Sequence, residues 1–281
     1  MSSAVRPVDR LIAAYNVLLV IVWGSLIGRA DYAAPIALAH AAALSLPWML
    51  ERGAARFGAF TRTLHDVYPL LLMLAFWTEL GFLRPFHGPT HDAWVVALDL
   101  AVFRVHLNVV WMPAMPWLWF SELMHLSYYA YYIIIIGPPL ALLLTRRRDP
   151  MRDVVLRLMV TYLGCYTLYL MFPVDGPGHT MVHYQGAPNT GFFYHLVHEA
   201  GDFGDSMGTA FPSSHVAGSL TAAWAGWRWF SRPVAILLAL EAAGVVVATV
   251  YTQNHYAIDV LAGILWAVLL QLTVVPVLER A

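Results

Sequence analysis

Two long apolar runs near the end of the chain, PVAILLALEAAGVVVATVY at 233–251 and AIDVLAGILWAVLLQLTVVP at 257–276, decide the fold. Each has the length of about 20 residues that an α-helix needs to cross the roughly 30 Å hydrocarbon core of a membrane. Across the chain, 60% of residues are hydrophobic and only 12% are charged, against about 25% charged in an ordinary soluble domain. The sequence therefore predicts an all-α, polytopic integral membrane protein.

Eight apolar runs are candidate membrane spans, and the last six form the predicted core of the bundle. The runs cover 11–28, 34–50, 67–83, 118–144, 154–172, 213–230, 233–251 and 257–276. No repeat or change of composition divides the chain, so we expect a single integral membrane domain over 1–281. Within it, 1–66 would supply peripheral N-terminal spans and 67–281 the core. Histidines and aspartates interrupt the apolar segment 87–112, which favours an amphipathic element lying at the membrane interface.

The arginines are distributed very unevenly between alternate loops. The chain has 16 basic residues, all of them arginine, and only Arg29, Arg84 and Arg104 fall in the arginine-poor set of loops. Because cytoplasmic loops retain positive charge, both termini are predicted to be cytoplasmic, and 173–212 and 251–256 to lie together on the outer side. The absence of lysine indicates a high-GC bacterial source, and hence an inner membrane with a periplasmic site. No basic tract suggests a nucleic-acid partner.

The first informative motif is Pro212-Ser213-Ser214-His215, at the start of a predicted helix. The beginning of a helix presents unpaired N–H groups and the positive end of the helix dipole, which together favour an anion. Ser213 and Ser214 would add hydroxyl donors to phosphate oxygens, and His215 would transfer a proton. In the alternative interpretation a serine only caps the helix and His215 is an interfacial polar residue.

The second motif places His255 and Asp259 four residues apart, on one face of a predicted helix. A carboxylate there would accept a hydrogen bond from one imidazole nitrogen and leave the other as a nucleophile. Asp259 would alternatively only stabilise a helix N-terminus. An ionisable residue inside an apolar run is energetically unfavourable, however, and such residues usually serve a function.

Together these strings resemble the second and third motifs of the type 2 phosphatidic acid phosphatase superfamily, which have the forms PSGH and HxxxD. The His-Tyr-x-x-Asp-Val form of 255–260 is most similar to the branch of inositol phosphorylceramide synthases and sphingomyelin synthases. The resemblance implies a catalytic core in which His255 is the nucleophile, Asp259 orients it and His215 is the general acid. It further implies phosphate binding by Ser213 and Ser214, a phosphohistidine intermediate, and no cofactor or metal.

The chain also departs from the superfamily pattern, because it lacks the expected cations. The first motif, KxxxxxxRP, has no counterpart, since the chain contains no lysine, and the arginine six residues before the nucleophile is replaced by Thr249. Phosphoryl transfer requires positive charge near the developing negative charge. Arg84, which precedes Pro85, and Arg104 are therefore candidate phosphate-binding residues. Their alternative role is anchoring at lipid headgroups.

The leading hypothesis is a membrane lipid phosphatase or phosphotransferase acting on a lipid phosphate ester at the outer membrane face. Its expected partners are the lipid phosphate substrate and the bilayer. Water would complete a phosphatase reaction, and a second alcohol would complete that of an inositol phosphorylceramide synthase-like headgroup phosphotransferase. The sequence leaves both open.

Two other classes of protein, membrane transporters and non-catalytic membrane scaffolds, share some of these features. A membrane transporter would also place His and Asp within the membrane, but the paired broken helices of such proteins are not visible in the sequence. A non-catalytic scaffold would leave His215, His255 and Asp259 without a role. His195, His198 and Glu199 have helical spacing for a zinc site, but they lack the HExxH pattern, so we expect no metal.

Overall fold

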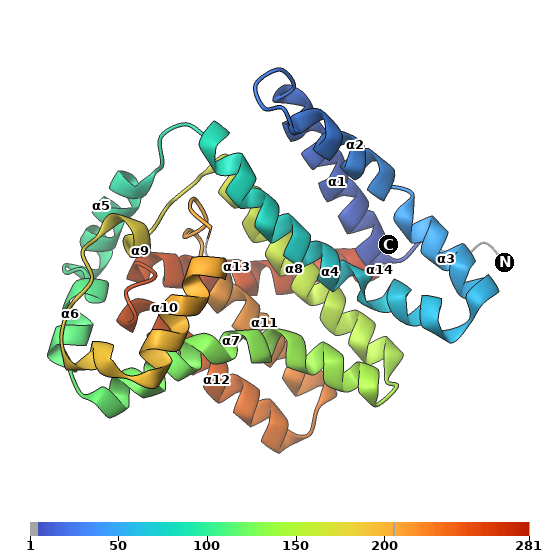
Figure 1. The fold of residues 1–281 in the computed structure, drawn as a ribbon. Coiled ribbons are helices and arrows are strands. Elements are labelled where there is room, and N and C mark those ends of the chain that lie inside the picture. Colours follow the sequence, from blue (N-terminus) through green and yellow to red (C-terminus); the bar gives the residue numbers. More distant parts are fainter. Residues whose placement is uncertain (1–4, 205, 281) are drawn as a thin grey trace. The chain divides into compact units, whose positions relative to one another are not determined.

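A computed structural model describes residues 5–204 and 206–280, with the side chains of all of these except 54–55 and 199–204. These residues form helices and no strand, which confirms the all-α prediction. In chain order the helices are α1 (Pro7–Ser25), α2 (Ala33–Ala43), α3 (Leu46–Phe57), α4 (Ala59–Leu83), η1 (Arg84–Phe86), α5 (Asp92–Phe103), α6 (Leu107–Ala114), α7 (Leu118–Leu144), α8 (Arg148–Met171), α9 (Pro177–Thr180), η2 (Ala187–Thr190), α10 (Phe192–Gly204), α11 (Ser214–Trp229), α12 (Arg232–Tyr251), α13 (Ala257–Leu272) and α14 (Val274–Arg280) (Figure 1).

Within the described part of the chain, six helical segments are long and apolar enough to cross a membrane. They are α1, α4 continued to Phe86, α7, α8, α12, and α13 continued through α14. Two bent pairs, α2 with α3 and α5 with α6, pass the same test together, with bends of 44° and 61°. The chain is thus an integral membrane protein with six to eight candidate spans, and the predicted eight lies at the upper end of that range.

Two of the predicted segments are not among the six single long helices. The predicted span 213–230 is α11, whose 16 residues reach only about 24 Å at 1.5 Å per residue. Most of its side chains are buried, and it contacts α7, α8, α12 and α13. Segment 87–112, predicted to lie at the interface, forms most of the bent pair α5 and α6, and its position relative to the membrane stays a prediction.

The chain forms two compact units. One comprises residues up to Leu74 together with those from Val277 onward, and the other comprises Ala75–Pro276. The predicted division between peripheral N-terminal spans and a core beginning at residue 67 is not tested by this partition and stays a prediction.

Several buried polar groups within the first unit are paired with one another. The Asp9 carboxylate accepts hydrogen bonds from Arg6 Nη2 at 2.7 Å and from the Tyr68 hydroxyl at 2.6 Å, which joins α1 to α4. Asn16 of α1 and His40 of α2 lie 2.8 Å apart through Oδ1 and Nδ1. Such pairing offsets the free energy of placing polar groups in an apolar environment.

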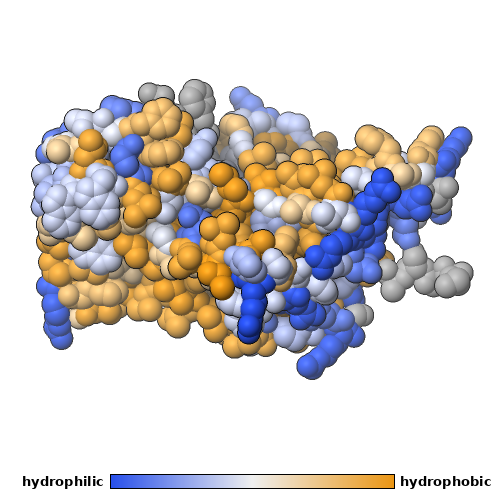
Figure 2. Space-filling view, turned by 90° about the horizontal axis from the view of Figure 1, so that it is seen from below, coloured by the Kyte–Doolittle hydropathy of each residue, from blue (hydrophilic) through white to orange (hydrophobic). Residues whose placement is uncertain are grey.

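The second unit is built around α11 and presents apolar side chains on its outer helices. Exposed side chains on these helices include Ile133 of α7, Leu237 of α12 and Leu265 of α13, at 67%, 66% and 62% exposure. Figure 2 shows apolar atoms over much of the face that it presents. Large exposed apolar surfaces mark contact with lipid or with another protein, and lipid is the natural contact for helices of this length.

The starts of α11 and α13 approach each other at Gly263. A Cβ placed on Gly263 would lie 2.6 Å from the carbonyl oxygen of Ser213 and 3.3 Å from the Val216 Cβ. The backbone of α13 therefore lies directly against the beginning of α11. Only glycine allows this approach without a shift of one helix.

Replacing Gly263 by alanine is expected to lower the free energy of unfolding by about 1–3 kcal/mol, the usual effect of overpacking. The measurement is the thermal unfolding midpoint of the purified protein in detergent. The matched control is Gly137→Ala in α7, where a Cβ would meet only Ile133 Cγ2, at 4.0 Å. An equal or higher midpoint for Gly263→Ala than for Gly137→Ala would show that the close approach is not required.

The first turn of α13 is capped by a residue from α5. Asp99 is fully buried, and its Oδ1 accepts a hydrogen bond from the backbone N–H of Ile258 at 3.0 Å. Its other oxygen lies 2.9 Å from His106 Nδ1. The first N–H groups of a helix have no partner within the helix, so Asp99 supplies one from a distant part of the chain.

Asp99→Ala is expected to destabilise the fold by about 1–2 kcal/mol, as loss of a helix cap does. Asp99→Asn keeps an oxygen acceptor for the Ile258 N–H and is expected to retain most of the stability. Thermal unfolding midpoints of the two variants in detergent provide the comparison. Equal midpoints for both variants would contradict the capping role, because only the alanine removes the acceptor.

Candidate active site

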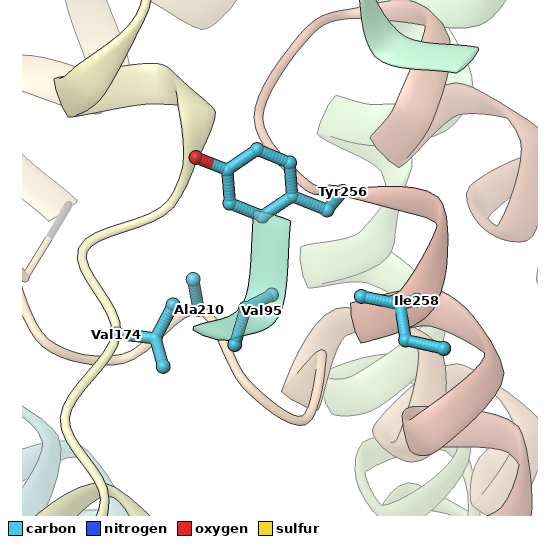
Figure 3. Packing of buried hydrophobic residues seen from close by; sticks show 5 residues of the cluster. All are labelled: Val95, Val174, Ala210, Tyr256 and Ile258. Atoms are coloured by element: carbon cyan, nitrogen blue, oxygen red, sulfur yellow. The ribbon is translucent and has the colours of Figure 1, made fainter. Parts of the chain in front are cut away.

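A small apolar cluster joins four segments that are distant in the sequence. Its buried members are Val95, Val174, Ala210, Tyr256 and Ile258 (Figure 3). They come from α5, from the segment after α8, from the segment before α11, and from the start of α13. Burial of these side chains in one cluster holds the two sequence motifs beside the loop that follows α8.

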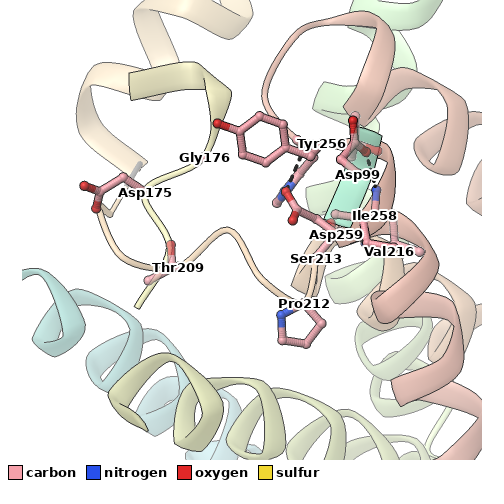
Figure 4. A network of polar contacts seen from close by, with 12 residues as sticks. Asp99, Asp175, Gly176, Thr209, Pro212, Ser213, Val216, Tyr256, Ile258 and Asp259 are labelled. Atoms are coloured by element: carbon pink, nitrogen blue, oxygen red, sulfur yellow. Dashed lines mark hydrogen bonds and ion pairs between the residues drawn. The ribbon is translucent and has the colours of Figure 1, made fainter. Parts of the chain in front are cut away.

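His255 and Asp259 are held together at the start of α13. His255 Nδ1 lies 3.3 Å from Asp259 Oδ2, and the side chains are 6% and 0% exposed. The same carboxylate oxygen accepts a hydrogen bond from the Tyr256 backbone N–H at 2.9 Å (Figure 4). The carboxylate thus faces Nδ1 of the imidazole, so Nε2 is the nitrogen directed away from it.

His215 stands in the first turn of α11 and faces the second motif. Its ring centroid lies 5.7 Å from that of His255, and the ring packs on Tyr128 and Tyr131 of α7 at 5.0 and 4.2 Å. Since α11 begins at Ser214, His215 lies at the positive end of the helix dipole, which favours an anion nearby. The structure therefore brings His215, His255 and Asp259 together.

Ser213 and Ser214 are buried at the beginning of α11, where Ser213 caps the helix and Ser214 is its first residue. Both are buried, at 0% and 2% exposure. Ser213 Oγ accepts a hydrogen bond from the Val216 N–H at 3.4 Å as a helix cap, and its own backbone N–H donates to the Asp259 carbonyl oxygen at 3.0 Å. Neither serine is among the residues that line the pocket described next. Their predicted phosphate contact stays a prediction.

A pocket opens beside the two imidazoles. Its lining residues come from α4, α7, the loop after α8, the segment before α11, and the two motifs. They are Trp77, Tyr128, Asp175, Gly178, His179, Ser206, Thr209, Ala210, His215, Asn254 and His255. Among the described residues that line this pocket there are three imidazoles and one carboxylate, and no arginine. The arrangement suits proton transfer and nucleophilic attack within one small space.

The two predicted cations lie in different environments. Arg84 forms a bidentate ion pair with Asp175, with Nε to Oδ1 and Nη2 to Oδ2 both at 3.0 Å. Because Asp175 lines the pocket, Arg84 stands directly behind the pocket wall. Arg104 is exposed at the bend between α5 and α6, with a φ of 66°, and is not among the pocket-lining residues.

The sequence predicts that 173–212 and 251–256 lie together on the outer side, but it did not assign Asp175 or His179 of this loop to the site. Asp92 of α5 accepts hydrogen bonds from the backbone N–H groups of Asp175 and Gly176, at 3.0 and 2.9 Å. Gly176 has a φ of 82°, and a Cβ there would lie 2.7 Å from the Ala210 Cβ. This fixed loop places Asp175 and His179 in the pocket. The run of Gly and Pro at 176–178 was the available signal, since it marks a tight turn rather than a flexible linker.

Three ionisable side chains near the pocket, two histidines and one tyrosine, have shifted pKa values. Burial lowers the pKa of His87, and the nearby positive charge of Arg84 lowers it further. Burial and the neighbouring His198 lower the pKa of His183, in the loop beyond His179. Both imidazoles are therefore neutral near pH 7. Burial raises the pKa of Tyr256 to about 12, against the opposing effect of a hydrogen bond with Thr180.

The three residues with the spacing of zinc ligands do not form a metal site among the side chains that the structure describes. His195 is exposed on α10, whereas His198 stacks on Tyr194 with ring centroids 4.0 Å apart. The side chain of Glu199 lies outside the described residues. Among the side chains that are described, no group of three histidine, cysteine, aspartate or glutamate residues could hold a metal ion.

Comparison with known families supplies the class of this site. The PAP2 superfamily matches residues 93–273, well over half of the chain. No curated protein and no solved structure matches the chain. The matched segment begins in α5 and includes both motifs and every pocket-lining residue except Trp77. The chain therefore belongs to the PAP2 superfamily, a group whose membership indicates phosphatase or phosphotransferase activity on phosphate esters.

Proposed function

We propose that the protein is a membrane lipid phosphatase or phosphotransferase that works through a phosphohistidine on His255. The observation that carries the proposal is the placement of two imidazoles in one pocket, with centroids 5.7 Å apart. Behind the second imidazole lies a fully buried carboxylate, that of Asp259, at 3.3 Å from Nδ1. These are the groups that an in-line attack on phosphorus requires.

In the proposed reaction, His255 Nε2 forms a bond to phosphorus while the bond from phosphorus to the ester oxygen breaks. His215 gives its proton to the departing oxygen, so that the leaving group departs as a neutral alcohol. The imidazole of His255 then carries positive charge, which Asp259 stabilises through Nδ1. In the second half-reaction, His215 accepts a proton from the incoming nucleophile, whose oxygen displaces Nε2 from phosphorus.

The nucleophile in the second half-reaction decides between two activities. Water gives a phosphatase and returns inorganic phosphate, whereas a second alcohol gives a headgroup phosphotransferase. The His-Tyr-x-x-Asp-Val form of the second motif, at 255–260, favours the phosphotransferase of the inositol phosphorylceramide synthase-like branch. A lipid substrate fits either case, because the bundle has six to eight candidate spans. Its tail would stay in the membrane while the phosphate enters the pocket.

The test is release of inorganic phosphate from a panel of lipid phosphates by the purified protein in mixed micelles, with transfer to added alcohols measured in parallel. His255→Ala and His215→Ala are expected to lower kcat at least about 10²-fold, the contribution typical of a positioned acid or base. Asp259→Asn should lower it as well, because the asparagine does not stabilise the imidazolium. Orthovanadate should inhibit, and a chelator should not.

The matched control is His195→Ala, since His195 is exposed on α10 and outside the pocket lining. It should retain wild-type activity. Turnover by His255→Ala comparable to that of the control, with an unchanged thermal midpoint, would end the assignment of the nucleophile.

We further propose that the pocket faces the periplasm of a bacterial inner membrane, with both termini in the cytoplasm. α11 runs from His215 at the pocket to Arg228 in its last turn. There Arg147 Nη1 donates to the Trp229 carbonyl oxygen at 2.8 Å, which joins the arginine-rich α7–α8 junction to the end of α11. The arginines and the pocket thus lie at opposite ends of one helix, as the positive-inside rule would arrange them.

A pair of introduced cysteines tests this orientation. Val182 is 95% exposed beyond the pocket loop, and the Asp149 side chain is 93% exposed beside the α7–α8 junction, whereas the native Cys165 is buried. In intact cells, a membrane-impermeant maleimide should label Val182→Cys and spare Asp149→Cys until the membrane is opened. The reverse pattern would place the pocket in the cytoplasm.

A further inference from the structure

The pocket lacks the cation that phosphoryl transfer normally uses. Negative charge develops on the phosphoryl oxygens in the transition state, and enzymes neutralise it with fixed positive groups or donors. The chain contains no lysine, and none of the residues lining the pocket is arginine. A positive group must therefore come from another residue type in the wall or from a residue behind it.

The residue behind the wall is already neutralised. Arg84 is held by both oxygens of Asp175 at 3.0 Å, and its side chain passes close to Gly208, where an added Cβ would lie 3.0 Å from Arg84 Cδ. Bidentate ion pairs of this kind are strong and fixed in direction. The two nearby histidines outside the pocket, His87 and His183, have lowered pKa values and carry no charge near pH 7.

His179 is the remaining basic residue in the pocket wall. It lies in α9, one turn of helix whose ends are both fixed. Before it, Asp92 binds the backbone of Asp175 and Gly176. After it, Thr180 Oγ1 lies 2.9 Å from the Tyr256 hydroxyl, next to the nucleophile. His179 therefore lines the same pocket as His215 and His255 on a rigid loop rather than a mobile one.

We propose that His179 binds the phosphate as an imidazolium and supplies the positive charge that arginine or lysine would otherwise provide. The inference rests on the proposed phosphoryl-transfer function and adds a third imidazole to it. In this role His179 donates an N–H to a non-bridging phosphoryl oxygen, and no bond to His179 forms or breaks. Two protonated imidazoles, His179 and His215, then face the substrate while His255 attacks as the neutral base.

The groups around His179 are consistent with that division of roles. The titratable groups that share its pocket are Asp175, His215, His255 and Tyr128. Among the described lining residues, Asp175 alone carries a carboxylate, and that carboxylate forms an ion pair with Arg84. The further neighbour His183 feels His179 electrostatically, and its pKa is lowered in part by that interaction.

Two substitutions separate charge from shape. His179→Gln keeps a hydrogen-bond donor without the charge and should lower kcat/KM by about 10²–10³-fold, as removal of a transition-state donor does. His179→Arg restores a permanent positive charge and should stay within about 10-fold of wild type. The inhibition constant of orthovanadate should rise with Gln and not with Arg, which gives a binding readout independent of turnover. His195→Ala is the control.

The pH profile distinguishes a charged role from a structural one. An imidazole loses its charge within the range of about pH 5 to 8, whereas a guanidinium does not. The fall of kcat/KM with rising pH should therefore be less steep in His179→Arg than in wild type, because only His215 still titrates there. Equal steepness, or an arginine variant as impaired as the glutamine variant while both keep the wild-type thermal midpoint, would overturn the proposal.

The outcomes also separate this inference from the function on which it rests. Loss of activity in His255→Ala with full activity in His179→Gln would refute the role of His179 and leave the phosphoryl-transfer function intact. A wild-type protein inactive on every lipid phosphate would refute the function itself. In that case, vanadate binding by calorimetry still tests His179, and equal affinity in wild type and His179→Gln would refute it.

Discussion

The close contact between the beginnings of α11 and α13 is the constraint on which the pocket depends. It consists of one backbone hydrogen bond, from the Ser213 N–H to the Asp259 carbonyl oxygen at 3.0 Å, and of the space left by the missing side chain of Gly263. His215 lies two residues after Ser213, and His255 lies four residues before Asp259. A shift of either helix would change the 5.7 Å separation of the two rings, so a backbone contact fixes the geometry of the side chains.

That contact is stabilised from outside by α5. Asp99 caps the first turn of α13 through the Ile258 N–H, and Asp92, two turns earlier, binds the backbone at 175–176 that leads to His179. One short helix thus positions the start of α13 and the opposite wall of the pocket. Both carboxylates are directed at backbone N–H groups, whose hydrogen bonds to charged acceptors are stronger than neutral ones.

The sequence was sufficient for the helical class, for the long spans, and for the grouping of His215, His255 and Asp259, because these follow from run length, helix periodicity and motif resemblance. It was insufficient where the partner lies far away in the chain. Nothing near Asp99 indicates that it caps a helix 159 residues later, and nothing near Arg84 indicates its pairing with Asp175, 91 residues on.

The hydrogen bonding of Asp259 shows how the site can respond to charge. Its Oδ2 accepts a hydrogen bond from the Tyr256 N–H at 2.9 Å and lies 3.3 Å from His255 Nδ1, whereas its Oδ1 is buried and has no hydrogen-bond partner among the described residues. The backbone therefore fixes the carboxylate more firmly than the imidazole does. In the proposed mechanism His255 becomes positive only after attack, and a contact that is long in the resting state can then shorten. Such an interaction is stronger in the transition state than in the ground state, which is the condition for it to accelerate the reaction.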